Sequence, residues 1–247
     1  MSAYGKFASC YDELTGNVDY LQMAEYLHRV LEKHQVQNGI LLDLACGTGT
    51  LCETFAGFGY EMIGVDASEE MLSEAMNKKY ESGSDIIYLC QKMQDLDLYG
   101  TIDAAFCTMD SINHLNSISD VRKAFERVSL FLNPGGIFVF DCNSIYKHQH
   151  ILADNTFVYD CEDVYCVWQN TLLSDNRVGI HLDIFELDGK KYIRSEEEFC
   201  ETAFSENEII SCLKETGLEV LLINDGYSDM QPCKTTQRFV YVARKGE

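Results

Sequence analysis

GILLDLACGTG at residues 39–49 and EMIGVD at residues 61–66 are two short apolar segments separated by the length of one helix. An apolar run, a turn of small residues, a helix and a second apolar run ending in an acid are typical of the first βαβ unit of an open parallel sheet. Gly47 and Gly49 fall at the turn, where a backbone without Cβ atoms lets a ligand approach beside the positive end of the next helix. We therefore expect this turn to bind a ligand.

Two aspartates indicate the kind of ligand. Asp66 ends the second strand, where a carboxylate accepts hydrogen bonds from both hydroxyls of a ribose. Asp43 stands four residues before Gly47, where it would repel a pyrophosphate but hold an ammonium group directly or through water. Cys52 occupies the place of the third glycine in the dinucleotide fingerprint. These residues favour S-adenosylmethionine, a cationic nucleoside without phosphate, over NAD or FAD.

The segment from Asp43 to Asp66 resembles the first motifs of the class I S-adenosylmethionine-dependent methyltransferases of small molecules. The likeness extends through a helix and the sequence LNPGG at residues 132–136 to about residue 144. It implies an α/β fold with a Rossmann-like, doubly wound sheet of seven strands, the last of them antiparallel. It also implies S-adenosylmethionine as the cofactor and a small molecule as the partner.

The resemblance further implies a set of residues that contact the cofactor. These are Tyr11, Asp43, Ala45, Cys46, Gly47, Gly49, Asp66, Ala67, Met71, Gln94, Asp95 and Thr108. Small-molecule methyltransferases often cover the cofactor with a Phe-Ala-x-x-Tyr-Asp segment, which Phe7 to Asp12 match. Met71 is expected against the adenine, with ordinary helix packing as the alternative, and Asp95 at the adenine amino group, with a solvated loop carboxylate as the alternative.

A polar cluster follows the strand expected at residues 102–107. Ligands of doubly wound sheets bind beyond the carboxyl ends of the strands, where the winding reverses, so this cluster should face the transferable methyl group. Asp110 suits a cationic or amine substrate, and Asn113 or His114 suits substrate contact. Methyl transfer is an in-line displacement that needs a general base only when the acceptor is protonated, and His114, Asp110 or Tyr11 are the candidates. A hydrogen bond to the backbone at a helix start is the other interpretation of His114.

Residues 155–204 alternate between apolar and polar side chains, as in antiparallel strands joined by tight turns. We expect this segment to form an inserted lid, residues 147–204, over a methyltransferase core made of residues 1–146 and 205–247. The candidates for substrate contact in and next to this lid are Tyr146, Trp168, Arg194 and the segment 147–150. Simple packing also explains the alternating aromatic residues.

Several helix limits can be expected from local signals. Aromatic residues at 4, 7 and 11 share one face of a first helix. Ser68 should cap one helix, Ser119 and Asp120 should begin another over residues 121–130, and Ser205 with Glu208 should form a capping box.

Composition narrows the class of protein and its partners. The 247 residues include 40 acidic and 19 basic residues, for a net charge of -21, which repels nucleic acid and anionic membranes. The 11 cysteines are scattered and form no C-x-x-C pair, which favours a reducing cytosol and disfavours a metal site. The sequence shows neither a signal-peptide pattern nor an apolar run long enough to span a membrane, so we expect a cytoplasmic protein. The oligomeric state and the methyl acceptor cannot be read from the sequence.

Two other functions fit parts of this pattern. One is an NAD-dependent oxidoreductase on a similar sheet, which Asp43 and the missing third glycine disfavour. The other is a non-catalytic protein that binds an adenosyl ligand, since an intact pocket does not prove turnover.

Overall fold

The computed structural model describes residues 7–173 and 176–246, and its centre is a mixed sheet of seven strands. The strands lie in the order β10-β11-β5-β4-β1-β2-β3. Their bounds are β1 Ile40–Leu44, β2 Glu61–Asp66, β3 Ile87–Cys90, β4 Ile102–Cys107, β5 Leu132–Asn143, β10 Leu218–Asp225 and β11 Arg238–Lys245. Six of these strands, β1 to β5 and β10, run in the same direction, and β11 runs antiparallel to its neighbours β5 and β10. The predicted doubly wound fold with its antiparallel last strand is confirmed.

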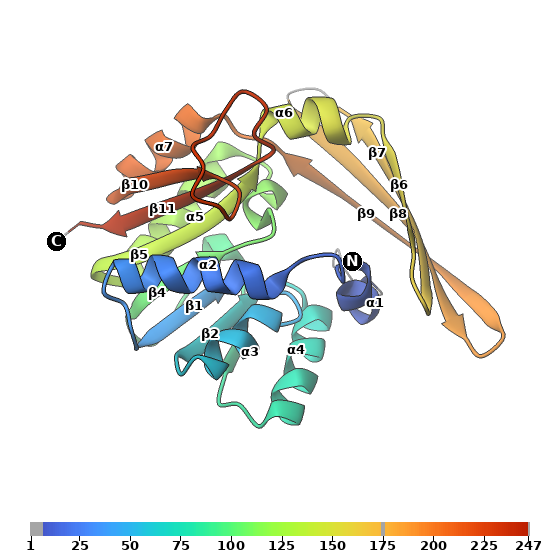
Figure 1. The fold of residues 1–247 in the computed structure, drawn as a ribbon, viewed down its shortest axis with the longest axis horizontal. Helices are drawn as coiled ribbons and strands as arrows, with labels where there is room; N and C mark the ends of the chain where they lie inside the picture. Colours follow the sequence, from blue (N-terminus) through green and yellow to red (C-terminus); the bar gives the residue numbers. More distant parts are fainter. Residues whose placement is uncertain (1–6, 174–175, 247) are drawn as a thin grey trace.

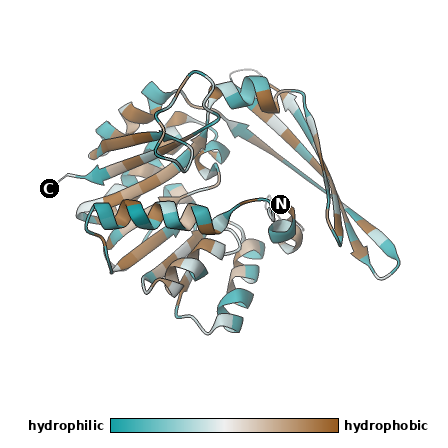
Figure 2. Ribbon diagram, in the orientation of Figure 1, coloured by the Kyte–Doolittle hydropathy of each residue, from teal (hydrophilic) through white to brown (hydrophobic). Residues whose placement is uncertain are grey.

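Helices cover both faces of this sheet because successive residues of the strands point to opposite faces. Leu41 packs with α2 and α3 on one face, whereas Leu42 packs with α5 and α7 on the other. Figure 2 shows apolar residues along these strands and polar residues on the outer sides of the helices. The helices are α1 Phe7–Leu14, α2 Tyr20–Lys33, α3 Thr50–Gly57, α4 Glu69–Ser82, α5 Ile118–Phe131, α6 Ile145–Lys147 and α7 Glu206–Glu215. Short turns of helix occur at η1 Met93–Asp95, η2 Ser111–His114 and η3 His148–Leu152, the last a π turn.

A second sheet contains four antiparallel strands in the order β6-β7-β8-β9. They are β6 Thr156–Asp160, β7 Val164–Leu172, β8 Arg177–Asp188 and β9 Lys191–Thr202. Figure 1 shows this sheet standing apart from the first, with α1 close to it. Its apolar face, which includes Ile180 and Leu182, packs on Phe7 and Leu14 of α1 and on Met71 of α4. The expected antiparallel pairing of this segment is confirmed.

The caps agree with the sequence except at α5. Ser68 accepts a hydrogen bond from the Met71 backbone, and Ser205 forms the expected capping box with Glu208. In contrast, α5 begins at Ile118 with Ser117 as its cap, so the start expected at Ser119 and Asp120 was wrong. The Ser117 hydroxyl accepts the Asp120 amide, which satisfies the first turn one step earlier.

The predicted first helix and the predicted lack of a membrane span can be examined only over the described residues. Phe7 and Tyr11 lie on α1 with their ring centroids 5.3 Å apart, whereas Tyr4 lies outside the described residues. Within residues 7–173 and 176–246, no helix combines the length and apolar character needed to cross a bilayer.

Candidate active site

The turn between β1 and α3 is shaped by three residues with positive φ. Ala45 has φ 62°, Gly47 has φ 54° and Gly49 has φ 76°. A Cβ atom at Gly49 would come within 2.4 Å of the Tyr88 hydroxyl, so this glycine is required for packing. A Cβ at Gly47 would meet nothing within 4 Å, because the backbone there faces open space. The turn therefore presents bare backbone to a cavity.

Asp66, at the carboxyl end of β2, holds this turn in place. Its two carboxylate oxygens accept the backbone N–H groups of Gly47 and Ser68, each at 2.9 Å. Burial raises the pKa of this carboxyl group above its ordinary value. A carboxylate offers about four lone-pair sites, so lone pairs remain for the hydroxyls of a ligand.

The side chain of Asp66 lines a cavity of about 340 Å³. Seven of the twelve predicted cofactor residues line it, namely Tyr11, Ala45, Gly47, Asp66, Ala67, Met71 and Gln94. Asp95 is exposed and is not among the lining residues, because η1 turns Met93 and Gln94 toward the cavity instead. A nucleoside fits this space in volume and in polar groups.

Asp43 borders a smaller cavity of about 40 Å³, together with Cys46 and Thr108. The carboxyl group is 1% exposed, and its Oδ2 accepts a hydrogen bond from the Cys52 thiol at 3.4 Å. Its Oδ1 has no hydrogen-bond partner among the described residues. Burial raises the pKa of Asp43 to about 7. A buried acceptor without a partner beside a bare turn is suited to a ligand ammonium group.

A third cavity, of about 370 Å³, lies between the two sheets. Its wall is aromatic and comes from α1 and the second sheet, with Phe7, Phe157, Tyr159, Trp168 and Phe199. Its polar end includes Asp110, His114, Lys147, Glu201 and Arg238. Tyr11 and Met109 line all three cavities, and His114 lines the two larger ones. The three spaces therefore meet at Tyr11 and Met109.

The loop after β4 carries backbone strain at this junction. Met109 has φ 56° and Asp110 has φ 52°, which is unusual for residues other than glycine. Both backbone N–H groups point at the buried carboxylate of Asp141, at 2.9 and 2.6 Å. Tyr227 donates its hydroxyl to the same carboxylate, and Arg238 donates to it at 2.6 Å. Asp141 thus stabilises the loop that presents Met109 to the cavities.

Arg238 also fixes the charge of Asp110. Its guanidinium lies 2.6 Å from the Asp110 carboxylate. Although burial acts in the opposite direction, this cation holds the pKa of Asp110 well below its usual range. A carboxylate held in this way is a weak base.

Three of the predicted substrate residues do not line the third cavity. The Asn113 amide donates to the Asn143 and Thr202 carbonyls and accepts the Asn143 N–H, so it joins η2 to β5 and β9. Tyr146 packs on the His150 ring at 4.8 Å. Arg194 is exposed and pairs with Asp183 and Glu196. Of the residues predicted to contact the substrate, those that line the third cavity are Asp110, His114, Lys147 and Trp168.

The sequence analysis missed Met109, Glu201 and Arg238 as lining residues. These residues come from the loop after β4, from β11 of the first sheet and from β9 of the second sheet, which the Asn113 side chain joins to η2 through the Thr202 carbonyl. No local motif marks them.

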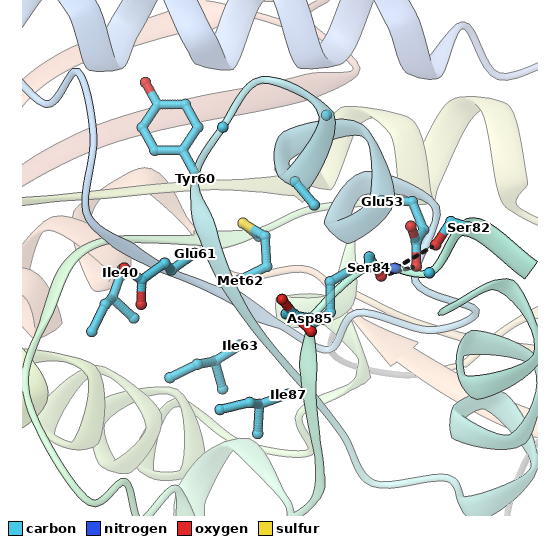
Figure 3. A pocket seen from close by; sticks show the side chains of 15 residues that line it. Ile40, Glu53, Tyr60, Glu61, Met62, Ile63, Ser82, Ser84, Asp85 and Ile87 are labelled. Carbon is cyan, nitrogen blue, oxygen red and sulfur yellow. Dashed lines mark hydrogen bonds between the residues drawn. The ribbon is translucent and has the colours of Figure 1, made fainter. Parts of the chain in front are cut away.

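A larger cavity of about 670 Å³ lies at the other end of the strands (Figure 3). Ile40, Glu61 and Ile87, at the amino ends of β1, β2 and β3, line it, and the Ser84 hydroxyl donates to Glu53 at 3.0 Å. It contains none of the predicted cofactor residues. Because ligands of open α/β sheets bind at the carboxyl ends, this cavity is not the candidate site.

Known proteins resemble this chain over its full length. A family model described as a methyltransferase domain matches residues 41–136. YqeM of Bacillus subtilis, a protein named as a methyltransferase, is 34% identical over 246 residues, which cover 99% of this chain and 98% of YqeM. The crystal structure of an S-adenosylmethionine-dependent methyltransferase from Clostridium acetobutylicum is 36% identical, covers 99% of each chain and superposes with a TM-score of 0.90. The sugar N-methyltransferase KedS8 of Streptoalloteichus is 22% identical, with a TM-score of 0.81 over 100% of this chain and 97% of KedS8, and shares the fold.

Proposed function

Because this chain belongs to the S-adenosylmethionine-dependent methyltransferases, we propose that it methylates a small molecule held in the cavity of about 370 Å³ between its two sheets. S-adenosylmethionine supplies a methyl group that is already activated by a sulfonium. The protein then has to align the two reactants and exclude water.

The residues of the two smaller cavities fit the cofactor. Asp66 has lone pairs left for the ribose hydroxyls, and the open space above Gly47 admits the ligand against the backbone. The unpartnered Oδ1 of Asp43 accepts the ammonium group. Met71 and Gln94 contact the adenosine portion in the cavity that Asp66 lines.

One observation carries the proposal, which is that Tyr11 and Met109 line all three cavities. A ligand whose ribose lies at Asp66 and whose ammonium lies at Asp43 has its central sulfur near these two side chains. The third cavity opens at the same point, so an acceptor bound there faces the methyl group. We call the cavity of about 370 Å³ the acceptor cavity and the cavity of about 340 Å³ the adenosine cavity. His114 lines both and therefore borders the path between them.

The size and walls of the third cavity support a small acceptor. Its volume is within the range of small-molecule sites, and its walls come from both sheets and α1. The aromatic side chains exclude water from the reacting groups. The net charge of -21 disfavours nucleic acid as the acceptor. All 11 cysteines are free thiols, which supports a place in the reducing cytosol.

A screen for the acceptor tests this function. Purified protein and S-adenosylmethionine are incubated with amines, hydroxyl compounds and carboxylates, and release of the thioether product is measured. An acceptor should raise this release well above the rate without acceptor. If none of the three classes raises it while the cofactor binds, the proposed transfer to an amine, hydroxyl or carboxylate acceptor is contradicted.

Asp66→Ala tests the cofactor site. The variant should lose affinity for S-adenosylmethionine by about 100-fold in calorimetry, because two charge-assisted hydrogen bonds and the anchor of the turn are removed. Asp95→Ala, on an exposed residue nearby, is the matched control and should bind normally. Equal affinity in the Asp66→Ala protein and the wild type would contradict the site.

A further inference from the structure

Glu201 and His148 form a buried pair at the edge of the acceptor cavity. Glu201 lies near the end of β9, is 2% exposed and lines the cavity. His148 opens the π turn η3 and has no exposed surface. The His148 Nε2 atom lies 3.5 Å from Oε2 of Glu201. The pair therefore joins a buried histidine to a carboxyl group that faces the acceptor.

The surroundings of His148 define where its proton lies. Its Nδ1 is 3.0 Å from the backbone carbonyl of Asn176, and because a carbonyl only accepts, Nδ1 must carry a hydrogen. In the neutral ring, Nε2 then presents a lone pair. Within the described chain, this Nε2 has no hydrogen-bond partner, and the atom that it faces is a carboxylate oxygen. A lone pair facing a carboxylate is unfavourable, and one additional proton between the two atoms removes the conflict.

Glu201 is better placed to take a proton than the other carboxylate of this cavity. Asp110 is paired with Arg238, whereas Glu201 has no Arg or Lys within 4 Å among the described residues. Glu201 Oε2 accepts the Asn143 side-chain N–H at 3.2 Å, and Lys147 donates to the same asparagine at 2.8 Å. One polar atom from each of Asp110, His114 and Glu201 lies within 4.8 Å of the others. The acceptor end of the cavity therefore lies within reach of the Glu201 carboxylate.

We propose that Glu201 takes the proton released by the methyl acceptor, and that His148 is a positioning residue that shares this proton. The proposal rests on the proposed function and names the base for it. A lone pair of the acceptor nitrogen or oxygen forms the new bond to the methyl carbon. The carbon–sulfur bond breaks with its electron pair going to sulfur, and the acceptor N–H or O–H proton passes to Glu201. The resulting carboxyl O–H donates to Nε2 of His148, so no further reactant is needed.

The acceptor must therefore bring a removable proton, as an amine or a hydroxyl compound does. The charged and titratable groups that face the pair are Asp110, His114, Lys147 and Arg238, with Asp141 behind Arg238. Lys147 and Arg238 are cations, whereas Asp110 and Asp141 are anions, so the groups around the pair carry both signs of charge.

The first experiment observes the pair without any acceptor. Protein labelled with 15N-histidine is followed by NMR across pH, and His148→Asn assigns the His148 signals. The His148 ring should show a protonated Nδ1 and a lone pair on Nε2 at alkaline pH. The pH at which Nε2 gains its proton should differ between wild type and Glu201→Gln. An Nε2–H tautomer, or a titration that Glu201→Gln leaves unchanged, would overturn the pairing whether or not the protein methylates anything.

The second experiment uses the acceptor found in the thioether-release screen. Glu201→Gln should lower kcat by about 10²- to 10⁴-fold and should remove the acid limb of the pH profile. The affinity for S-adenosylmethionine should stay within about twofold, because Glu201 does not line the adenosine cavity. His148→Asn, which keeps a donor for the Asn176 carbonyl, should shift the acid limb without removing it.

Glu198→Gln is the matched control, since Glu198 lies on the same strand, exposed and paired with His181. It should keep the kcat and pH profile of the wild type. A Glu201→Gln enzyme with unchanged kcat and pH profile would refute the proposal. An acid limb that persists there but disappears in His114→Gln would assign the base to His114 instead. A screen with no acceptor contradicts the proposed function alone, and the NMR result still decides whether the pair exists.

Discussion

Folding buries the carboxyl group of Asp43, and burial disfavours its charged form. It is 1% exposed, one oxygen has only a thiol as its partner, and the other has none within the described chain. Burial raises its pKa from 3.8 to about 7. The native state without ligand thus holds a proton on Asp43 more tightly than the unfolded chain does. Stability from this group is present at acid pH and is lost as pH rises from about 4 to about 7.

Replacement of Asp43 by Asn separates stability from binding. At pH 8 the variant without ligand should gain about 1–3 kcal/mol in free energy of unfolding, because a buried charge is removed. At pH 5 this gain should be clearly smaller, because the stability from this group is lost only gradually between about pH 4 and pH 7. Its affinity for S-adenosylmethionine should fall about 10- to 100-fold. Urea titrations at both pH values and calorimetry measure these effects, and tight binding by a stabilised variant would contradict the role of Asp43.

The same group gives cofactor binding a dependence on pH. If the ammonium of the ligand binds the carboxylate form of Asp43, affinity should fall as the pH decreases below about 7. The decline should approach tenfold per pH unit. Calorimetry from pH 5 to 9 checks the curve, and Asp43→Asn should flatten it. An affinity that rises toward acid pH would have the wrong sign for this account.

Those parts of the site that are close in sequence could be predicted from it. Asp43, Gly47 and Asp66 lie on one βαβ unit, and the spacing of acid and glycine fixes their relation. Glu201 and Arg238 could not be predicted, because they lie on strands of two different sheets, β9 and β11, which only the tertiary fold brings to the loop after β4. The type of a polar side chain also does not reveal its partners, which is why Asn113 was assigned to the substrate although it binds backbone groups.

At the scale of elements, α1 is attached to the glycine turn and to α4. Thr48 donates its hydroxyl to Asp12 of α1 at 2.6 Å, and Lys78 of α4 lies 2.6 Å from the same carboxylate. Lys78 also donates to Thr48 at 3.0 Å and Thr50 at 2.8 Å. Because Tyr11 is on the same helix, these bonds hold the side chain that borders all three cavities.

Lys78→Met should loosen α1 without changing the cavities. The cofactor should dissociate about 3- to 10-fold faster, a modest effect because Asp12 and Lys78 are partly exposed and water weakens their attraction. The wild-type dissociation rate should rise with salt, and that of the variant should not. Stopped-flow measurements test both effects. Lys79→Met, one residue along the helix, is the control, and equal rates in the two variants would exclude a role for this contact.

Most helices and strands could be predicted because their apolar residues recur at regular intervals. The start of α5 could not. Serines at 117 and 119 are both good helix caps, and spacing alone does not choose between them. The choice depends on the hydroxyl that reaches the Asp120 amide, a detail of the folded backbone.

At the scale of the molecule, α1 connects the two sheets. Glu13 accepts the Asp163 N–H at 3.0 Å, and the Ser9 hydroxyl donates to Glu186 at 2.9 Å, on the side of the second sheet. Asp12 faces the glycine turn on the other side. The alternation of residues 155–204 could predict the pairing of the strands but not these contacts to the second sheet, which join residues 150 and 177 positions apart.

Hydrogen exchange with S-adenosylhomocysteine as the probe should reveal this connection. Exchange should slow in the glycine turn and α1, and also in β7, although β7 does not line the adenosine cavity. Strand β10, at the far edge of the first sheet, should exchange at an unchanged rate. Protection limited to the turn would mean that α1 does not link the sheets.

The location of α1 over the meeting point of the cavities also affects how long the spent cofactor stays. That product keeps the amino group and sugar of the cofactor and lacks only the methyl group and the charge on sulfur, so we expect both aspartates to hold it nearly as well. We expect its departure to require α1 to lift, and to be slower than bond formation. Protein purified from cells should then still contain this bound product, and measured activities will depend on how completely the product was removed.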